Sequence, residues 1–178
     1  MAAIGENLLK WDTSLFGCIA RRSRSAVLDR LLRSISRTAD GEAYPALPLL
    51  LILIRAQDWR RILLAFAISF ALELSIYKLL KQSVRRARPS HAIPGIEQLV
   101  VPPDLFSFPS GHTAAAFLSA ALLGHWFAPA IAPMYVWASL VGFSRVYLGV
   151  HYPADVMAGA SLGTLAAKAG ILISSAMS

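Results

Sequence analysis

The sequence predicts an all-α integral membrane protein, a bundle of about five transmembrane helices preceded by amphipathic helices at the membrane interface. Of its 178 residues, 56% are hydrophobic and 15% are charged, whereas a soluble domain is roughly half apolar and a quarter charged. Residues 113–144 contain no Lys, Arg, Asp or Glu, and this stretch exceeds the roughly 20 residues that one helix needs to cross a bilayer. The basic residues lie beside apolar segments, where anionic lipid headgroups are their nearest partners.

The first element is a basic amphipathic region. Between residues 4 and 37, apolar side chains recur at helical spacing, which predicts helices lying at the membrane surface with basic side chains toward the headgroups. The arginines of this region are Arg21, Arg22, Arg24, Arg30, Arg33 and Arg37. The alternative is a cytosolic helical pair that packs on a partner. Because Asp40-Gly41 is a turn signal, we divide the chain into an interfacial region, residues 1–40, and a transmembrane domain, residues 41–178.

Five apolar segments follow. Length and hydropathy predict spans at residues 43–57, 61–81, 111–127, 130–148 and 153–174. The first is short and contains Pro45 and Pro48. Two crossings separate the long loop at residues 82–110 from residues 145–153, so both should reach the same membrane face. Their polar side chains can therefore meet.

The remaining composition narrows the class of function. The formal net charge is +7, but the position of the basic residues favours lipid headgroups over nucleic acid. Cys18 is the only cysteine, which excludes an internal disulfide and a cysteine-based zinc site. The four histidines have no zinc-ligand spacing. We therefore expect no nucleic-acid partner, and these residues give no indication of a zinc site.

The stretch Pro109-Ser110-Gly111-His112 opens an apolar helix. Unpaired backbone N–H groups and the positive end of the helix dipole favour an anion there. Gly111 leaves room for an anionic oxygen, Ser110 can cap the helix and donate its hydroxyl, and His112 projects beside them. Taken alone, the stretch also fits a simple helix cap.

Lys81 and Arg88 provide positive charge at the start of the long loop. Lys81 ends a predicted span, and Pro89 keeps Arg88 extended. Cations at such positions also serve as interfacial anchors, and we assign that role to Arg85 and Arg86.

A third polar cluster follows the fourth predicted span. Pro153 suits the first turn of a helix, which places His151 just before that helix and Asp155 in its first turn. Such a carboxylate can accept the proton of one ring nitrogen and leave the other nitrogen as a nucleophile. Arg145 presents a planar fork suited to phosphate oxygens. A helix-capping Asp beside an interfacial His is the simpler alternative.

The three clusters together specify eleven positions, too many for coincidence: Lys81, Arg88, Pro89, Pro109, Ser110, Gly111, His112, Ser144, Arg145, His151 and Asp155. In residue type and in the spacing within each cluster, the chain from about residue 43 to 174 resembles the type 2 phosphatidic acid phosphatase (PAP2) superfamily of membrane lipid phosphatases. The resemblance implies that His151 attacks phosphorus to form a phosphohistidine, that Asp155 orients it, and that His112 protonates the leaving oxygen and then activates water. It also implies a phosphate site that needs no metal or other cofactor and is formed by Lys81, Arg88, Ser110, Gly111 and Arg145.

We expect a membrane lipid phosphatase that removes the terminal phosphate from a lipid phosphate or diphosphate. An undecaprenyl diphosphate phosphatase of the same fold is an alternative, because the motif concerns phosphate and not the lipid tail. A vanadate-using haloperoxidase is disfavoured by the uncharged stretch at residues 113–144, since the known members of that class are soluble. A non-catalytic lipid-binding membrane protein is the alternative from another class, and the intact His112, His151 and Asp155 argue against it.

The signals for membrane orientation conflict. Arg55, Arg60 and Arg61 favour an inward position for the loop between the first two spans, and hence an active site near the periplasmic face of a bacterial inner membrane. The seven cations of residues 1–40 favour the reverse. We expect the outward arrangement. The sequence specifies neither the lipid nor the oligomeric state.

Two features of the spans remain. Glu73 lies mid-span, where an ionisable group is either functional or paired with a buried polar group. Gly159 and Gly163 form a small-residue stripe, which we expect to allow close packing within the bundle, with dimerisation as the alternative.

Overall fold

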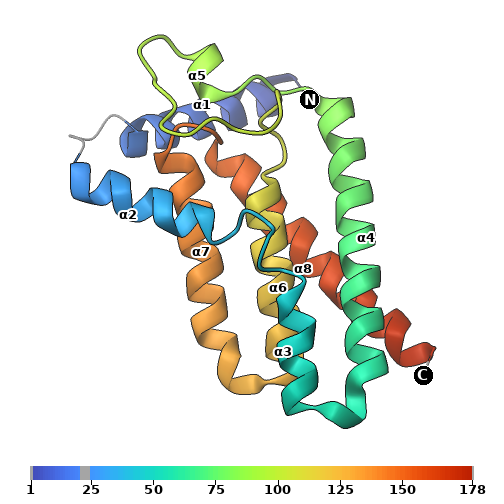
Figure 1. Ribbon diagram of the computed structural model, residues 1–178. Coiled ribbons are helices and arrows are strands. Elements are labelled where there is room, and N and C mark those ends of the chain that lie inside the picture. Colours follow the sequence, from blue (N-terminus) through green and yellow to red (C-terminus); the bar gives the residue numbers. More distant parts are fainter. Residues whose placement is uncertain (1, 21–24, 178) are drawn as a thin grey trace.

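The computed structural model describes residues 2–20 and 25–177, and this part of the chain is helical without strands. Its elements in chain order are α1 (Ala2–Ala20), α2 (Ala26–Arg37), α3 (Ala46–Ile54), η1 (Ala56–Asp58), α4 (Trp59–Val84), α5 (Pro89–Ala92), α6 (Gly111–Trp126), η2 (Ala128–Ala130), α7 (Ile131–Tyr147) and α8 (Pro153–Ala176). Figure 1 shows the long helices side by side, with α1 and α2 lying across one end of the bundle. The predicted basic side chains of Arg21, Arg22 and Arg24 lie outside the described residues.

The first predicted span differs from the structure. Over residues 43–57 the chain forms a turn, the nine-residue helix α3 and the short η1, and nine residues extend only about 14 Å against a hydrocarbon thickness of about 30 Å. Apolar composition led to the prediction, but the helix begins only after Pro45 and ends at Ile54. The other four predicted spans correspond to α4, α6, α7 and α8. By length and composition, two helical segments in the described chain could cross a membrane, Trp59–Ala92 and α8, so the count of five spans stays a prediction.

The three polar clusters meet at one end of the bundle, as predicted. The helices α4 and α7 end there, and α6 and α8 begin there (Figure 1). The backbone N–H of Ser110 donates to the carbonyl of Asp155 at 3.0 Å, and Arg88 donates to the carbonyl of Val150 at 2.7 Å. These contacts join the long loop, the start of α6 and the start of α8 into one unit.

Small residues on α8 allow its close approach to α6 and α4. A Cβ atom added to Gly163 would lie 2.0 Å from the carbonyl oxygen of Ala114, and one added to Gly159 would lie 2.4 Å from that of Ser110. Distances this short exclude any side chain. The stripe therefore serves packing within the chain, as predicted, and it presses α8 against the first turn of α6.

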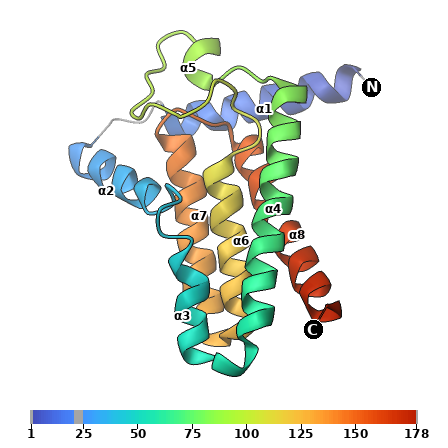
Figure 2. The same ribbon diagram turned by 45° about the vertical axis from the view of Figure 1, so that its right-hand side comes forward.

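The outside of the bundle is strongly apolar. Large exposed side chains on it include those of Leu53, Leu79, Val136, Leu165 and Leu172. The helix α2 packs against α7 (Figure 2) and buries Leu32 while exposing Val27 and Leu31. So much exposed apolar surface suits a protein in contact with lipid.

Candidate active site

The N-termini of α6 and α8 lie next to each other at the centre of the site, joined by the hydrogen bond from Ser110 to Asp155. Ser110 precedes α6 in an extended conformation, and its hydroxyl lies 2.9 Å from that of Thr113. Gly111 is the first residue of the helix, and a Cβ atom there would lie 3.0 Å from the ring of Tyr77. The glycine thus permits the aromatic ring to approach the helix start, where backbone N–H groups are free to bind an anion.

Three buried cations surround these N-termini. Lys81, Arg88 and Arg145 are 7%, 1% and 3% exposed, which is far less than for ordinary surface cations. Lys81 donates to the Tyr77 hydroxyl at 2.7 Å and to the Asp104 carboxylate at 2.8 Å. Arg88 also pairs with Asp104. One carboxylate in the long loop therefore holds two of the three cations predicted to bind phosphate.

Asp104 is ionised in this setting. Burial alone would raise the pKa of its carboxyl group, but hydrogen bonds from Lys81 and Tyr77 and the positive charges of Lys81 and Arg88 outweigh it and lower the pKa below the ordinary value. The sequence analysis did not identify Asp104. Its partners lie 16 to 27 residues away in the chain, so local spacing gave no indication of it.

Arg145 approaches the site from the end of α7. One terminal nitrogen donates to the Ser36 hydroxyl of α2 at 2.6 Å, whereas its Nε is buried without a hydrogen-bond partner in the described chain. A buried charged donor without a partner is costly. This guanidinium group therefore has capacity to bind an anion.

His151 and Asp155 lie together as predicted, although not yet hydrogen-bonded. The His151 Nδ1 is 3.7 Å from Asp155 Oδ2 and has no hydrogen-bond partner among the described residues. Complete burial lowers the pKa of His151 to about 4, because the interior disfavours the charged imidazolium. The ring is therefore neutral at pH 7, the form that a nucleophile requires.

Arg86 contacts Asp155 directly, which corrects its assignment as an interfacial anchor. Its guanidinium group bridges Asp155 Oδ1 at 2.8 Å and Asp12 Oδ2 at 2.6 Å. Burial alone would lower the pKa of Arg86, but the charge of Asp155 and then the contacts with Asp12 raise it. Asp12 also accepts the backbone N–H of Ala154 at 2.8 Å. The sequence analysis missed Asp12, which lies 142 residues before Ala154.

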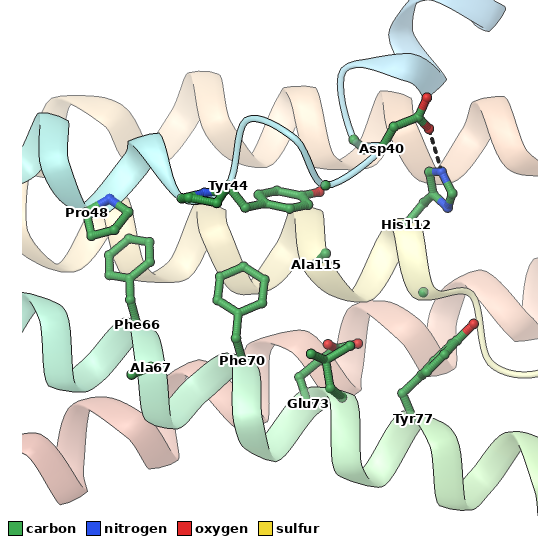
Figure 3. A pocket seen from close by; sticks show the side chains of 15 residues that line it. Asp40, Tyr44, Pro48, Phe66, Ala67, Phe70, Glu73, Tyr77, His112 and Ala115 are labelled. Atoms are coloured by element: carbon green, nitrogen blue, oxygen red, sulfur yellow. Dashed lines mark hydrogen bonds and ion pairs between the residues drawn. The ribbon is translucent and has the colours of Figure 1, made fainter. Parts of the chain in front are cut away.

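His112 contacts a residue of the N-terminal region. Its Nε2 lies 2.8 Å from Asp40 Oδ1 (Figure 3), and Asp40 belongs to the turn between α2 and α3. A carboxylate in this position orients the ring. The predicted acid and base of the reaction is thus held by a residue outside the three motif clusters.

Two cavities meet at His112 and Asp40. The first, of about 560 Å³, is lined mainly by apolar side chains of the α2–α3 turn, α4 and α6. Figure 3 shows Phe66 and Phe70 along it, with Glu73 and Tyr77 nearer to His112. The second, of about 490 Å³, is lined by Arg33, Arg37 and Arg145 among others. An apolar tail and an anionic headgroup could therefore occupy neighbouring spaces.

Fold and site together define a helical protein of apolar exterior with a cationic cradle and two histidines suited to phosphate-ester chemistry. Residues 59–176 match the family model of the PAP2 superfamily. The chain is 30% identical to an undecaprenyl-diphosphatase of Sulfolobus acidocaldarius over 166 residues, which cover 90% of this chain and 77% of that protein.

Two crystal structures are similar in fold. One is LpxE of Aquifex aeolicus, with a TM-score of 0.77 and 29% identity over 89% of this chain and 93% of that one. The other is a transmembrane PAP2-type phosphatidylglycerolphosphate phosphatase of Bacillus subtilis, with a TM-score of 0.78 and 25% identity over 97% of this chain and 88% of that one.

The chain belongs to the PAP2 superfamily. The predicted family, the all-helical membrane fold and the class of enzyme, a lipid phosphatase, are thereby confirmed.

Proposed function

We propose that this phosphatase removes the terminal phosphate from a lipid phosphate or diphosphate through a phosphohistidine at His151, without a metal ion. The observation that carries the proposal is the convergence of His151, His112 and three buried cations on two adjoining helix N-termini. Phosphoryl transfer depends mainly on positioning and on stabilising charge on the transferred group, and this arrangement supplies both.

The first step is attack on phosphorus by His151 Nε2. As the phosphorus–nitrogen bond forms, the bond to the lipid oxygen breaks, and that oxygen takes a proton from His112. Positive charge develops on the His151 ring. The Asp155 carboxylate, 3.7 Å from Nδ1, accepts a hydrogen bond from the Nδ1–H and stabilises this charge. The dephosphorylated lipid then leaves.

The second step is hydrolysis of the phosphohistidine. His112, now neutral, takes a proton from a water molecule, which attacks phosphorus and breaks the bond to His151. Inorganic phosphate is released, and His112 carries its proton again. Through both steps the phosphate oxygens are bound by Lys81, Arg88, Arg145, the Ser110 hydroxyl and the Gly111 N–H.

Phosphate release by the purified protein tests this proposal. Matched micelles would contain undecaprenyl diphosphate, phosphatidylglycerophosphate, phosphatidate or lipid A, each with a chelator present, and His151→Ala would be the control. We expect release from at least one lipid and none from the variant. Release that depends on added metal, or that persists in the variant, would contradict the mechanism.

We further propose that the site faces the periplasm from a bacterial inner membrane. Arg55, Arg60 and Arg61 lie at the end of the bundle opposite the site, as an inward loop requires. The only cysteine, Cys18, is exposed on α1 at the site end. An impermeant maleimide should label Cys18 in intact cells. In a Cys18→Ser background, Gln57→Cys should react only after permeabilisation. The opposite labelling pattern would show that the site faces the cytoplasm.

A further inference from the structure

The apolar cavity contains two polar groups that have no hydrogen-bond partner among the described residues. Glu73 is 2% exposed, and the described residues offer its carboxyl group no hydrogen bond or ion pair. The alternative of a buried polar partner therefore finds no support in this part of the chain. The Tyr44 hydroxyl is buried and also lacks a hydrogen-bond partner among the described residues. Both side chains line the cavity, and Figure 3 shows them on opposite walls, Tyr44 from the turn before α3 and Glu73 from α4.

A buried carboxyl group without a partner is costly, because burial removes its hydrogen bonds to water. The cost is larger here since the rest of the cavity is formed mostly by side chains such as Pro48, Phe66 and Phe70. Burial, followed by the negative charges of Glu73 and Asp40, raises the pKa of Tyr44, so its hydroxyl keeps its proton. The cavity thus presents one carboxyl group and one hydroxyl donor on facing walls.

Their position relative to the phosphate site defines what could satisfy them. Glu73, Tyr77 and Lys81 follow one another at intervals of four residues on α4, so they lie on one face and Glu73 is about 12 Å from Lys81 along the helix axis. The Lys81 side chain reaches back to the Tyr77 hydroxyl, 2.7 Å from its Nζ, and His112 lines the same cavity. Glu73 therefore lies near the point where the substrate's linkage joins its apolar chain.

We propose, building on the function above, that Glu73 and Tyr44 form a polar subsite that selects lipid phosphates carrying a hydroxyl or amide N–H between the phosphate and the chain. Glu73 accepts the hydrogen bond from that group, and Tyr44 donates to an oxygen of the same linkage. A lipid whose phosphate is followed directly by hydrocarbon leaves both groups buried and unsatisfied. Discrimination against a substrate that lacks a needed polar group is typically strong.

Two matched lipids test the proposal. One is an acylglycerol phosphate with a free 2-hydroxyl, and the other is the acyl-propanediol phosphate of the same chain length without it. We expect wild-type kcat/KM to be at least tenfold higher for the hydroxylated lipid. Glu73→Leu should reduce that ratio to about one, chiefly by improving use of the deoxy lipid. Glu73→Gln, which keeps an accepting oxygen, should retain most of the preference, and Tyr44→Phe should reduce it partly.

Glu42→Leu is the matched control, because Glu42 is exposed and does not line the cavity; its ratio should equal that of the wild type. An equal ratio in wild type and Glu73→Leu, or no preference in the wild type, would overturn the proposal. Competition between the two lipids for binding to the His151→Ala protein gives the same comparison without turnover. Absence of turnover by the wild type, with the binding preference intact, would count against the proposed reaction and not against this subsite.

Discussion

Replacing Arg86 with Gln should strongly destabilise the protein. The Arg86 side chain is 20% exposed, and the two carboxylates that it joins, Asp12 and Asp155, are 3% and 0% exposed. Removing one partner of such a buried ion pair costs roughly 3–5 kcal/mol, because the remaining charge is left uncompensated. Two carboxylates would face each other here without the arginine.

That cost corresponds to a fall in Tm of roughly 6–20 °C, since each kcal/mol shifts Tm by about 2–4 °C in a chain of this size. The assay is thermal unfolding in detergent, with Arg85→Gln as the matched control. This control removes the same charge from the neighbouring position. Arg85 is exposed, and its Nε donates only to the Gln82 carbonyl, so the Tm of the Arg85→Gln protein should change by less than about 2 °C.

Adding Asp12→Asn to Arg86→Gln should recover part of the lost stability, because one of the two uncompensated charges disappears. Equal Tm values for Arg86→Gln and Arg85→Gln would refute the reasoning. They would return Arg86 to the role of an interfacial anchor.

Three further predictions concern charge and packing. Burial lowers the pKa of His151 to about 4, so NMR spectra of the histidine-labelled protein should show a neutral ring from pH 8 to about 5. Because the unfolded chain binds this proton below about pH 6.5, the stability that the neutral ring contributes is lost as the pH falls from about 6.5 toward 4. Protonation of His151 near pH 6.5 in the folded protein would contradict this. Asp104→Asn should strengthen inhibition by inorganic phosphate roughly tenfold, about 1.4 kcal/mol, because the Asp104 carboxylate competes with phosphate for Lys81 and Arg88. Unchanged or weaker inhibition would show that Asp104 only orients these cations. Gly163→Ala should lower the free energy of unfolding by about 1–3 kcal/mol through overpacking. Gly17→Ala should not lower it, because no atom lies within 4 Å of the added Cβ. Similar Tm values for the two variants would argue against the close approach of α8 to α6.

The sequence predicted those parts of the site that depend on local chain geometry. The helix α6 begins at Gly111, where an apolar run follows Ser110, and Pro153 fixes where α8 begins. The predicted cap bond from Ser110 is not formed, because its hydroxyl contacts that of Thr113. The helices α4, α6, α7 and α8 were likewise predictable from local patterns. Their directions followed from the order of the spans, and this order brings His151 to the same end as His112.

The groups that hold the motif residues in place could not be predicted in this way. Asp40, Asp12 and Asp104 contact His112, Arg86 and Lys81 across 72, 74 and 23 residues of chain. No periodicity links such pairs, since their encounter depends on how α1, the α2–α3 turn and the long loop fold over the bundle. The predicted span at residues 43–57 was too long for a related reason. Hydropathy identifies an apolar segment, but Pro45 and the turn before it determine where α3 starts.

The most direct test of the account is to trap the phosphorylated enzyme. A substrate with a radiolabelled terminal phosphate would be mixed with the protein and quenched in alkali, where phosphohistidine survives, and the labelled peptide would be sequenced. The account predicts label on His151 in the wild type, none in His151→Ala, and more label in His112→Asn if hydrolysis of the intermediate slows more than its formation. Turnover without labelled protein, or label on another residue, would contradict nucleophilic attack by His151.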